Sequence, residues 1–379
     1  MTEIRKENPA FLEYAICRVA EGAGLTATHA RYIAEAIVFA HRQGKLNQGL
    51  GVYEAIDLVL DIGVLDPLAV PEMVSEGPAF AVFNGNASSG YYTLNLMAKK
   101  AIEIAKETGI AIVFGSNHND GGSFARYVYL AYEQDMMAIA SNNTVPLAAP
   151  FGGMFNLLSC PPFDAIVPSG DEPPIWASLK FAEWYDADIS EAVLQNQPMK
   201  GKWLIDPESG EVTDDARPYA KPIPGYGRVW DASCAGQIET PRTYALNLWN
   251  EGLAAIINPL GIPSSELPTI DDFANGNAAP SVGGSYYICI DPSRFGPIEA
   301  VKEKSDKFIR EISNVRPRPG QRVRIPGEDG YRSLQDSEST VDVLENHWQP
   351  FFDNIAAKYG LNEAILRDEF ETQPIAGST

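Results

Sequence analysis

His118 is the side chain of this sequence best placed for proton transfer. It ends the run Gly115-Ser116-Asn117-His118, which follows the apolar stretch 110–114, and Gly121 and Gly122 come shortly after it. Strand ends in α/β proteins carry reactive groups, and an imidazole with a pKa of about 6.5 can give or take a proton near neutral pH. The same residues also fit a solvent-exposed or helix-capping histidine in a tight glycine turn, so the local pattern leaves both roles open.

Two further polar segments are candidates for binding a small ligand. Asn142-Asn143-Thr144 follows a second apolar stretch, 136–140, and faces the same side as His118 if the two strands are parallel neighbours. The loop Gly44-Lys45-Leu46-Asn47-Gln48-Gly49 offers side-chain amides and a lysine, although a solvated connection between helices has the same composition. Two strand ends that converge are a better signal than either end alone.

Several common catalytic and binding motifs are absent from the sequence. It has no GxGxxG after its first strand, no GxxxxGK[ST] and no GxSxG, and it lacks the histidine pairs and CxxC pairs of metal sites. We therefore predict no metal ion, no P-loop and no nucleophile elbow.

The alternation of helical and strand patterns predicts an α/β fold around these segments. Apolar spacings of three and four residues predict helices, and short apolar runs predict strands. The expected helices cover 9–23, 28–43, 52–62, 91–108, 123–134, 243–257 and 297–312, with two more in 339–370, and the expected strands cover 80–83, 110–114, 136–140 and 285–290. The strand–turn–helix–strand series from 110 to 140 then presents His118 at the end of a buried strand.

The composition narrows the class of partner. The 379 residues are 45% hydrophobic and 21% charged, enough for a large core, and 50 Asp+Glu against 29 Lys+Arg give a formal charge of -21. An acidic surface repels phosphates, so nucleic acid is not an expected partner. No segment approaches about 18 consecutive apolar residues, and the first residues lack the apolar run of a signal peptide, so we expect a cytoplasmic protein that does not enter a membrane.

Taken together, these segments resemble the type-2 malate/L-lactate dehydrogenase family, which includes ureidoglycolate, sulfolactate and diketogulonate dehydrogenases and cyclic-imine reductases. Ser116-Asn117-His118 and its glycine-rich turn are followed at 141–153 by Ser-Asn-Asn-Thr-Val-Pro-Leu-Ala-Ala-Pro-Phe-Gly-Gly. Further likeness lies in the N-terminal helical pair, in 44–49, in 288–295 and in the Pro-Gly-Glu pattern of 319–328. The likeness covers most of the chain.

The resemblance implies a non-Rossmann mixed sheet with an N-terminal helical region and C-terminal helices, a homodimer, and NAD or NADP as cofactor. It also implies that His118 is the acid/base of hydride transfer at a carbon bearing a hydroxyl or an amine. In this pattern 1–75 is the helical part of a substrate and dimerisation domain, and 76–330 is a central α/β region with the nicotinamide-binding lobe at about 115–285. The last segment, 331–379, is helical and packs back on the first domain.

Departures from the family pattern concern the groups that hold ligands. Where the family has Ser-His-Gly and then an arginine for the substrate carboxylate, this chain has Asn47-Gln48-Gly49 and Val52. The family's cofactor-loop Gly-Thr-Asn-Pro is replaced by Ser159-Cys160-Pro161-Pro162, and its Asp-x-Ala-x-Ser is reduced to Trp176-Ala177-Ser178. Its Lys-Gly before a helix becomes Arg242-Thr243, and arginine and lysine are not interchangeable.

The matched segments supply the candidate site residues. The catalytic candidate is His118; the substrate-binding candidates are Gln48, Asn47, Asn117 and Asn143, and the cofactor-binding candidates are Thr144, Gly152, Gly153, Ser159 and Arg242. The sequence favours an NAD(P)-dependent oxidoreductase acting on a small 2-oxo acid-like or imine compound, or on its reduced form. Because the cofactor loop is altered, the alternatives are a His118-dependent isomerase, lyase or hydrolase on the same scaffold, and a non-catalytic binding protein.

Overall fold

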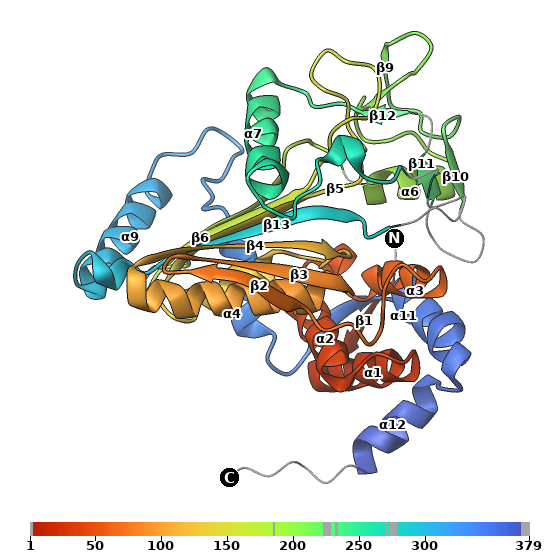
Figure 1. The fold of residues 1–379 in the computed structure, drawn as a ribbon, viewed down its shortest axis with the longest axis horizontal. Coiled ribbons are helices and arrows are strands. Elements are labelled where there is room, and N and C mark those ends of the chain that lie inside the picture. The colour runs from red at the N-terminus through yellow and green to blue at the C-terminus, as the bar shows by residue number, and fades with distance from the viewer. Residues whose placement is uncertain are drawn as a thin grey trace.

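A seven-stranded mixed sheet crosses the centre of the computed structural model, which describes residues 3–184, 186–222, 229–231, 234–269, 272 and 279–372 (Figure 1). From one edge to the other the strands are β2 (Glu72–Gly77), β3 (Phe80–Ser88), β4 (Ile110–His118), β13 (Val282–Ile290), β5 (Met137–Thr144), β6 (Pro162–Val167) and β7 (Ile175–Lys180). Within it only β3 and β4 pair in parallel, and every other adjacent pair is antiparallel. The predicted mixed α/β fold is confirmed.

Strand β13 occupies the centre of the sheet. It pairs with β4 on one side and with β5 on the other, so these two strands are not the direct neighbours that the sequence analysis gave as a condition. The reason lies in burial on both faces: Tyr286, Tyr287 and Cys289 are all inaccessible to solvent, which suits a central strand. As a result β4 and β5 run in the same direction but are separated by a segment that lies about 140 residues later in the chain.

Helices from both ends of the chain cover one face of the sheet. Helices α4 (Gly90–Thr108) and α5 (Ala125–Tyr132) lie against the strands, and α2 (Ala27–Arg42) packs on both. Beyond them are α1 (Pro9–Gly22), α3 (Tyr53–Asp61), α10 (Glu328–Asp336), α11 (Glu345–Pro350) and α12 (Glu363–Thr372). Phe11 and Ile33 share a core with Trp348 and Phe351, which ties the C-terminal helices to the N-terminal ones.

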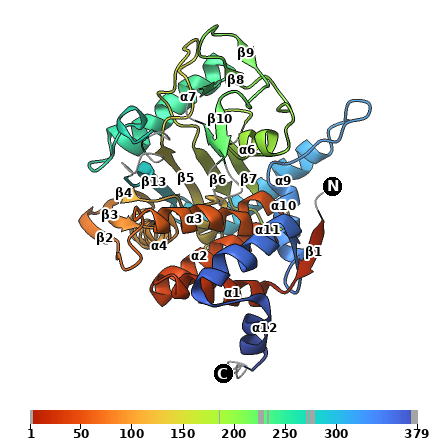
Figure 2. The same cartoon turned by 90° about the vertical axis from the view of Figure 1, so that its right-hand side faces the viewer.

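Helix α7 and a smaller lobe lie on the other face (Figure 2). Helix α7 (Pro241–Glu251) continues into a π-helical turn, Gly252–Ile256, that contacts β13 and β5. The lobe contains α6 (Asp186–Leu194), β8 (Leu204–Ile205), β9 (Val212–Thr213), β10 (Ala220–Pro222), β11 (Val229–Asp231) and β12 (Ala235–Gly236). Outside the lobe, α9 (Ile298–Ser313) follows β13, and β1 (Ile4–Glu7) pairs with β14 (Val341–Leu344). In the part of the chain that the structure describes, no helix is both long and apolar enough to cross a membrane.

The strands that carry the candidate site are longer than predicted. The apolar spacing placed helices α1, α2 and α4 to within two residues, but it ended the strands at 114 and 140. Pairing with β13 continues to His118 and Thr144, both opposite Val282, so the expected turn at 115–118 and loop at 142–144 are strand instead. The domain boundaries at 75 and 330 stay a prediction.

Three buried histidines share a lowered pKa but differ in their partners. His29 and His41 each accept a backbone N–H at Nε2, from Ser89 at 3.1 Å and from Leu50 at 2.8 Å. Burial lowers the pKa of both rings, and that of His118, to about 4. A backbone N–H cannot become an acceptor, so His29 and His41 must remain neutral to keep these bonds.

Acidification should therefore destabilise the fold between about pH 6.5 and pH 4. In that window the unfolded histidines bind protons while the folded ones do not, so the free energy of unfolding falls as pH falls, by at most about 3 kcal/mol for each histidine. Urea unfolding at a series of pH values measures the effect. Asp164 has the opposite effect on the free energy of unfolding, because burial raises its pKa to about 6 and the folded chain binds this proton first. It therefore offsets part of the loss of stability caused by one histidine.

The matched variant is His41→Gln, whose amide can still accept the Leu50 N–H but does not titrate. Its stability curve should be flatter than that of the unaltered chain between pH 6.5 and pH 4. An identical slope in the two proteins would show that His41 does not titrate as its burial requires.

Candidate functional site

His118 is the last residue of β4 and is fully buried. Its Nδ1 lies 2.7 Å from the carbonyl oxygen of Asn119, and its Nε2 lies 3.0 Å from Oγ of Ser285. Because a carbonyl only accepts, Nδ1 must carry the proton, which leaves Nε2 with its lone pair toward Ser285. Burial lowers the pKa of His118 to about 4, against a smaller opposing effect of the Asn119 carbonyl, so the ring is neutral at neutral pH.

Close backbone packing fixes the segment around His118. A Cβ at Gly85 of β3 would lie 2.7 Å from Cβ of His118 and 2.6 Å from the carbonyl oxygen of Asn117. Asn117 itself has a φ of 55° and hydrogen-bonds to Asn84 through its amide. A side chain in place of Gly85 would therefore push β4 away, and the glycine lets the two strands hold the histidine in one position.

Polar side chains from the next two strands lie on the same face as His118. Tyr286 bonds to Asn250 of α7, while Tyr287 bonds to Tyr127 of α5, so alternation along β13 puts Ser285 on the α5 side. Asn142 is paired directly with Ser285 across the β5–β13 ladder. Asn142 lies two residues after the buried Ala140, so the two side chains point to the same face of the sheet, toward α4 and α5. His118, Ser285 and Asn142 thus form a short polar row at one end of the sheet.

Asn143 faces the other way and is saturated by protein groups. Its Nδ2 donates to Oε1 of Glu251 at 2.9 Å and to the Ile262 carbonyl at 2.9 Å, and its Oδ1 accepts the N–H of Gly284 at 2.7 Å. Glu251 in turn accepts from the backbone N–H and hydroxyl of Ser264. This arrangement ties the end of α7 and the segment that follows it to β13. Substrate binding by Asn143 stays a prediction, because its amide would first have to give up these partners.

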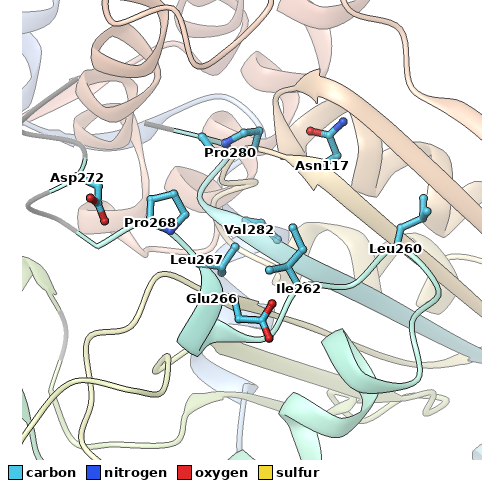
Figure 3. Close-up of a pocket in the computed structure, with 10 residues that line it drawn as sticks. Asn117, Leu260, Ile262, Glu266, Leu267, Pro268, Asp272, Pro280 and Val282 are labelled. Atoms are coloured by element: carbon cyan, nitrogen blue, oxygen red, sulfur yellow. The ribbon is translucent and has the colours of Figure 1, made fainter. Parts of the chain in front are cut away.

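A cavity of about 460 Å³ is lined by Asn117, Val282 and residues of the segment that follows α7 (Figure 3). Asn117 precedes His118 in the chain and Val282 pairs with it, and both line the cavity. Its other walls include Ile262, with Glu266 and Asp272 as acidic groups, and hydrogen bonds from Thr269 lower the pKa of Asp272. The volume suits a small ligand with an apolar face and hydroxyl groups, and the carboxylates disfavour phosphate at this point.

The loop between α2 and α3 contacts β7, which is an edge strand of the sheet. Asn47 is exposed, and Gln48 is half-buried with an Oε1 that has no hydrogen-bond partner in the part of the chain described. Lys45 donates to Oγ of Ser178 on β7 at 2.7 Å, and Ser178 pairs across the ladder with the buried Asp164. Burial lowers the pKa of Lys45 and raises that of Asp164 to about 6, and each group partly opposes the shift of the other.

The cofactor candidates are spread around α7 and the preceding loop. Thr144 ends β5 opposite Val282, and Ser159 is fully buried with an Oγ that has no partner among the described residues. Gly152 is exposed with a φ of 83° and open space around it, so the turn conformation, and not a close neighbour, requires glycine. Gly153 follows it, and Arg242 is exposed in the first turn of α7.

These positions are compatible with a nicotinamide dinucleotide. Two buried polar groups that have no hydrogen-bond partner among the described residues, the Asn142 amide and the Ser159 hydroxyl, are available to its neutral parts. The Arg242 guanidinium at a helix N-terminus is available to its phosphates. Among the described residues, no group of three or more His, Cys, Asp or Glu side chains could hold a metal ion.

Sequence reasoning missed Ser285 and the Lys45–Asp164 pair, and it placed Asn142 in a candidate segment without choosing it as a site residue. Ser285 follows two glycines at the start of a predicted strand, but nothing local shows that this strand lies beside His118. Asn142 adjoins the chosen Asn143, and only the alternation of the strand tells the two apart. Lys45 was visible in the loop sequence, whereas its contact with β7 was not.

Residues 9–351 match the family model described as Malate/L-lactate dehydrogenase. The L-sulfolactate dehydrogenase of Methanocaldococcus jannaschii is 28% identical over 342 residues, which are 89% of this chain and 93% of that protein. Its solved structure superposes with a TM-score of 0.79 and covers 96% of this chain and 99% of its own at 25% identity. The ureidoglycolate dehydrogenase (NAD(+)) of Escherichia coli K12 is 22% identical over 365 residues, 96% of this chain and 95% of that protein.

Truncation to alanine should destabilise the fold at Asn143 but not at Asn142. Asn143→Ala leaves Glu251 and the Gly284 N–H without their partner and should lower the free energy of unfolding by about 1–3 kcal/mol. Asn142→Ala removes an amide that has no partner among the described residues, so the free energy of unfolding should stay within about 0.5 kcal/mol or rise. Urea unfolding of both variants tests this, and equal destabilisation would show that the Asn142 amide has a structural partner.

Proposed function

Because the chain belongs to the malate/L-lactate dehydrogenase family, we propose that it is an NAD(P)-dependent oxidoreductase with His118 as general acid/base. Its substrate in this proposal is a small 2-oxo acid-like or imine compound that is reduced to the hydroxy or amino form, or the reverse. The family predicted from the sequence is confirmed. Its relatives are named dehydrogenases of sulfolactate and of ureidoglycolate, and the second name specifies NAD(+), which supports a nicotinamide cofactor.

The proposal rests chiefly on the partner of Nε2 in His118. In His41 this nitrogen accepts a backbone N–H, and in His29 it accepts one too, although it also lies 2.6 Å from Oγ of Ser89. In both rings the backbone N–H would repel an added proton and its hydrogen bond would be lost. In His118 it contacts the hydroxyl of Ser285, which can donate to a neutral ring or accept from a protonated one. Of these three buried rings, His118 is therefore the one that can change its protonation state without losing a hydrogen bond.

In this proposal the proton transfer takes place at Nε2. In the oxidation direction the neutral Nε2 accepts the substrate hydroxyl proton, directly or through the Ser285 hydroxyl, and the Asn119 carbonyl holds Nδ1–H in the required tautomer. A bound nicotinamide supplies the hydride acceptor or donor. Because the pKa of His118 is lowered to about 4, the ring is ready as a base at neutral pH. Reduction requires a protonated ring, so it needs a ligand that stabilises the imidazolium.

The other site residues divide between the two ligands in this proposal. Asn117 borders the cavity beside His118. Asn47 and Gln48 of the α2–α3 loop are further substrate-binding groups in this proposal. Thr144 and Ser159 lie nearer the neutral parts of the cofactor. The remaining cofactor groups are the turn at Gly152 and Gly153 and the exposed Arg242.

The proposal also includes a homodimer in the cytoplasm. The family resemblance is the reason to expect the dimer. The acidic composition, with a formal charge of -21, suits a soluble small-molecule enzyme and not a nucleic-acid partner. The choice between NAD and NADP is left to measurement.

Cofactor binding and a histidine variant test the function together. NADH or NADPH should bind and quench the tryptophan fluorescence. His118→Gln should keep that affinity within about twofold while turnover falls by about 100-fold to 10 000-fold, because only proton transfer is lost. Turnover is assayed with malate, sulfolactate and ureidoglycolate as trial substrates. His347→Gln, in α11, is the matched control and should remain active.

Failure to bind either nucleotide at millimolar concentration would contradict the oxidoreductase and favour a His118-dependent isomerase, lyase or hydrolase, or a binding protein. Binding with a fully active His118→Gln variant would keep the cofactor but remove His118 from the mechanism.

A further inference from the structure

Asn142 has a fully buried side chain whose amide is unpaired among the described residues. Its exposed fraction is 0%, and neither Oδ1 nor Nδ2 has a hydrogen-bond partner in the part of the chain described. Among the buried side-chain amides of that part, it is the one in which both atoms are unpaired. Leaving a buried amide without partners is unfavourable, because it gives up its hydrogen bonds to water. A group that is costly to the fold and tied to nothing in it is expected to serve a ligand.

The sheet places this amide next to the reacting centre. Asn142 is directly opposite Ser285 on the β5–β13 ladder, and side chains of such pairs have Cβ atoms about 5 Å apart. Ser285 contacts Nε2 of His118 at 3.0 Å. A ligand that reacts at His118 and also touches Ser285 therefore lies within reach of the Asn142 amide.

The unmet groups of Asn142 define the chemistry of its partner. Nδ2 needs an acceptor and Oδ1 needs a donor, side by side in one plane. A carboxylate would satisfy Nδ2 but would set a negative oxygen against Oδ1. The Lys45 ammonium, which interacts with Asp164 on β6, is already bonded to Ser178. A neutral carboxamide or ureido group, with its C=O and N–H adjacent, satisfies both atoms of Asn142 at once.

We propose that Asn142 binds a carboxamide-type group of the ligand by two parallel hydrogen bonds, and so sets the orientation of the reacting carbon at His118. This inference rests on the proposed function, because His118 defines the reacting centre. Two sources carry such a group: the carboxamide of the nicotinamide itself, and an amide or ureido group of the substrate. The neighbouring Asn143 cannot take this role without releasing Glu251 and Gly284.

The cofactor source is tested by binding of NADH and of its reduced 3-acetylpyridine analogue, which keeps the carbonyl but has a methyl group in place of the NH₂. The unaltered chain should bind NADH about tenfold more tightly than the analogue. Asn142→Ala gives up two hydrogen bonds to NADH but only one to the analogue, so it should lose about tenfold more affinity for NADH than for the analogue, and the preference disappears. Ser141→Ala, on the opposite face of β5, is the control and should keep the preference.

The substrate source is tested with oxamate, which carries an amide beside its carboxylate, against oxalate, which carries two carboxylates. Calorimetry is done on the free chain and on the NADH-saturated chain. If the substrate carries the amide, the unaltered chain prefers oxamate by about tenfold and Asn142→Ala loses that preference.

A lost preference in either arm supports the proposal and identifies the source. If Asn142→Ala changes neither preference while remaining folded by thermal unfolding, the proposal is overturned. Failure of NADH to bind at all would count against the oxidoreductase, whereas the oxamate comparison on the free chain would still decide the role of Asn142.

Discussion

The insertion of β13 between β4 and β5 is the constraint on which the candidate site depends. It brings Ser285 to within 3.0 Å of His118 on one side and pairs it with Asn142 on the other. Without this strand the two ends identified in the sequence would not share a reacting centre. Gly283 and Gly284 let the segment after α7 approach β13 closely, because a Cβ at either would lie 2.0 Å from a carbonyl oxygen, of Ile262 and of Ala254 respectively. The segment that follows α7 therefore packs directly against β13, the strand that carries Ser285.

Burial then determines the chemistry of the site. It lowers the pKa of His118 to about 4 and makes the imidazole a neutral base, and the Asn119 carbonyl fixes its tautomer. The same burial acts on His29 and His41, but their backbone partners hold them neutral as structural groups. The identity of the hydrogen-bond partner, and not the extent of burial, separates the acid/base candidate from the two structural histidines.

Local pattern was sufficient for much of the fold and for the central residue of the site. Apolar periodicity predicted α1, α2 and α4, and the strand before the Gly-Ser-Asn-His run led to His118. The neighbour of that strand could not be predicted, since pairing with β13 spans more than 160 residues and leaves no local signature. Nor could the choice between Asn142 and Asn143, because strand alternation sends one to the α5 side and the other to Glu251. The contact of Lys45 with Ser178 depends on the same long-range packing.

The central claim is that His118 is a neutral base whose Nε2 lone pair faces the ligand. Nitrogen-15 NMR of the ring nitrogens tests it most directly, with the spectrum recorded at pH 7 with and without NADH and a trial substrate. The account predicts a ring with hydrogen on Nδ1 and none on Nε2, and an Nε2 resonance that moves when ligands bind. A ring protonated on Nε2 at pH 7, or an Nε2 resonance unaffected by bound cofactor and substrate, would contradict it.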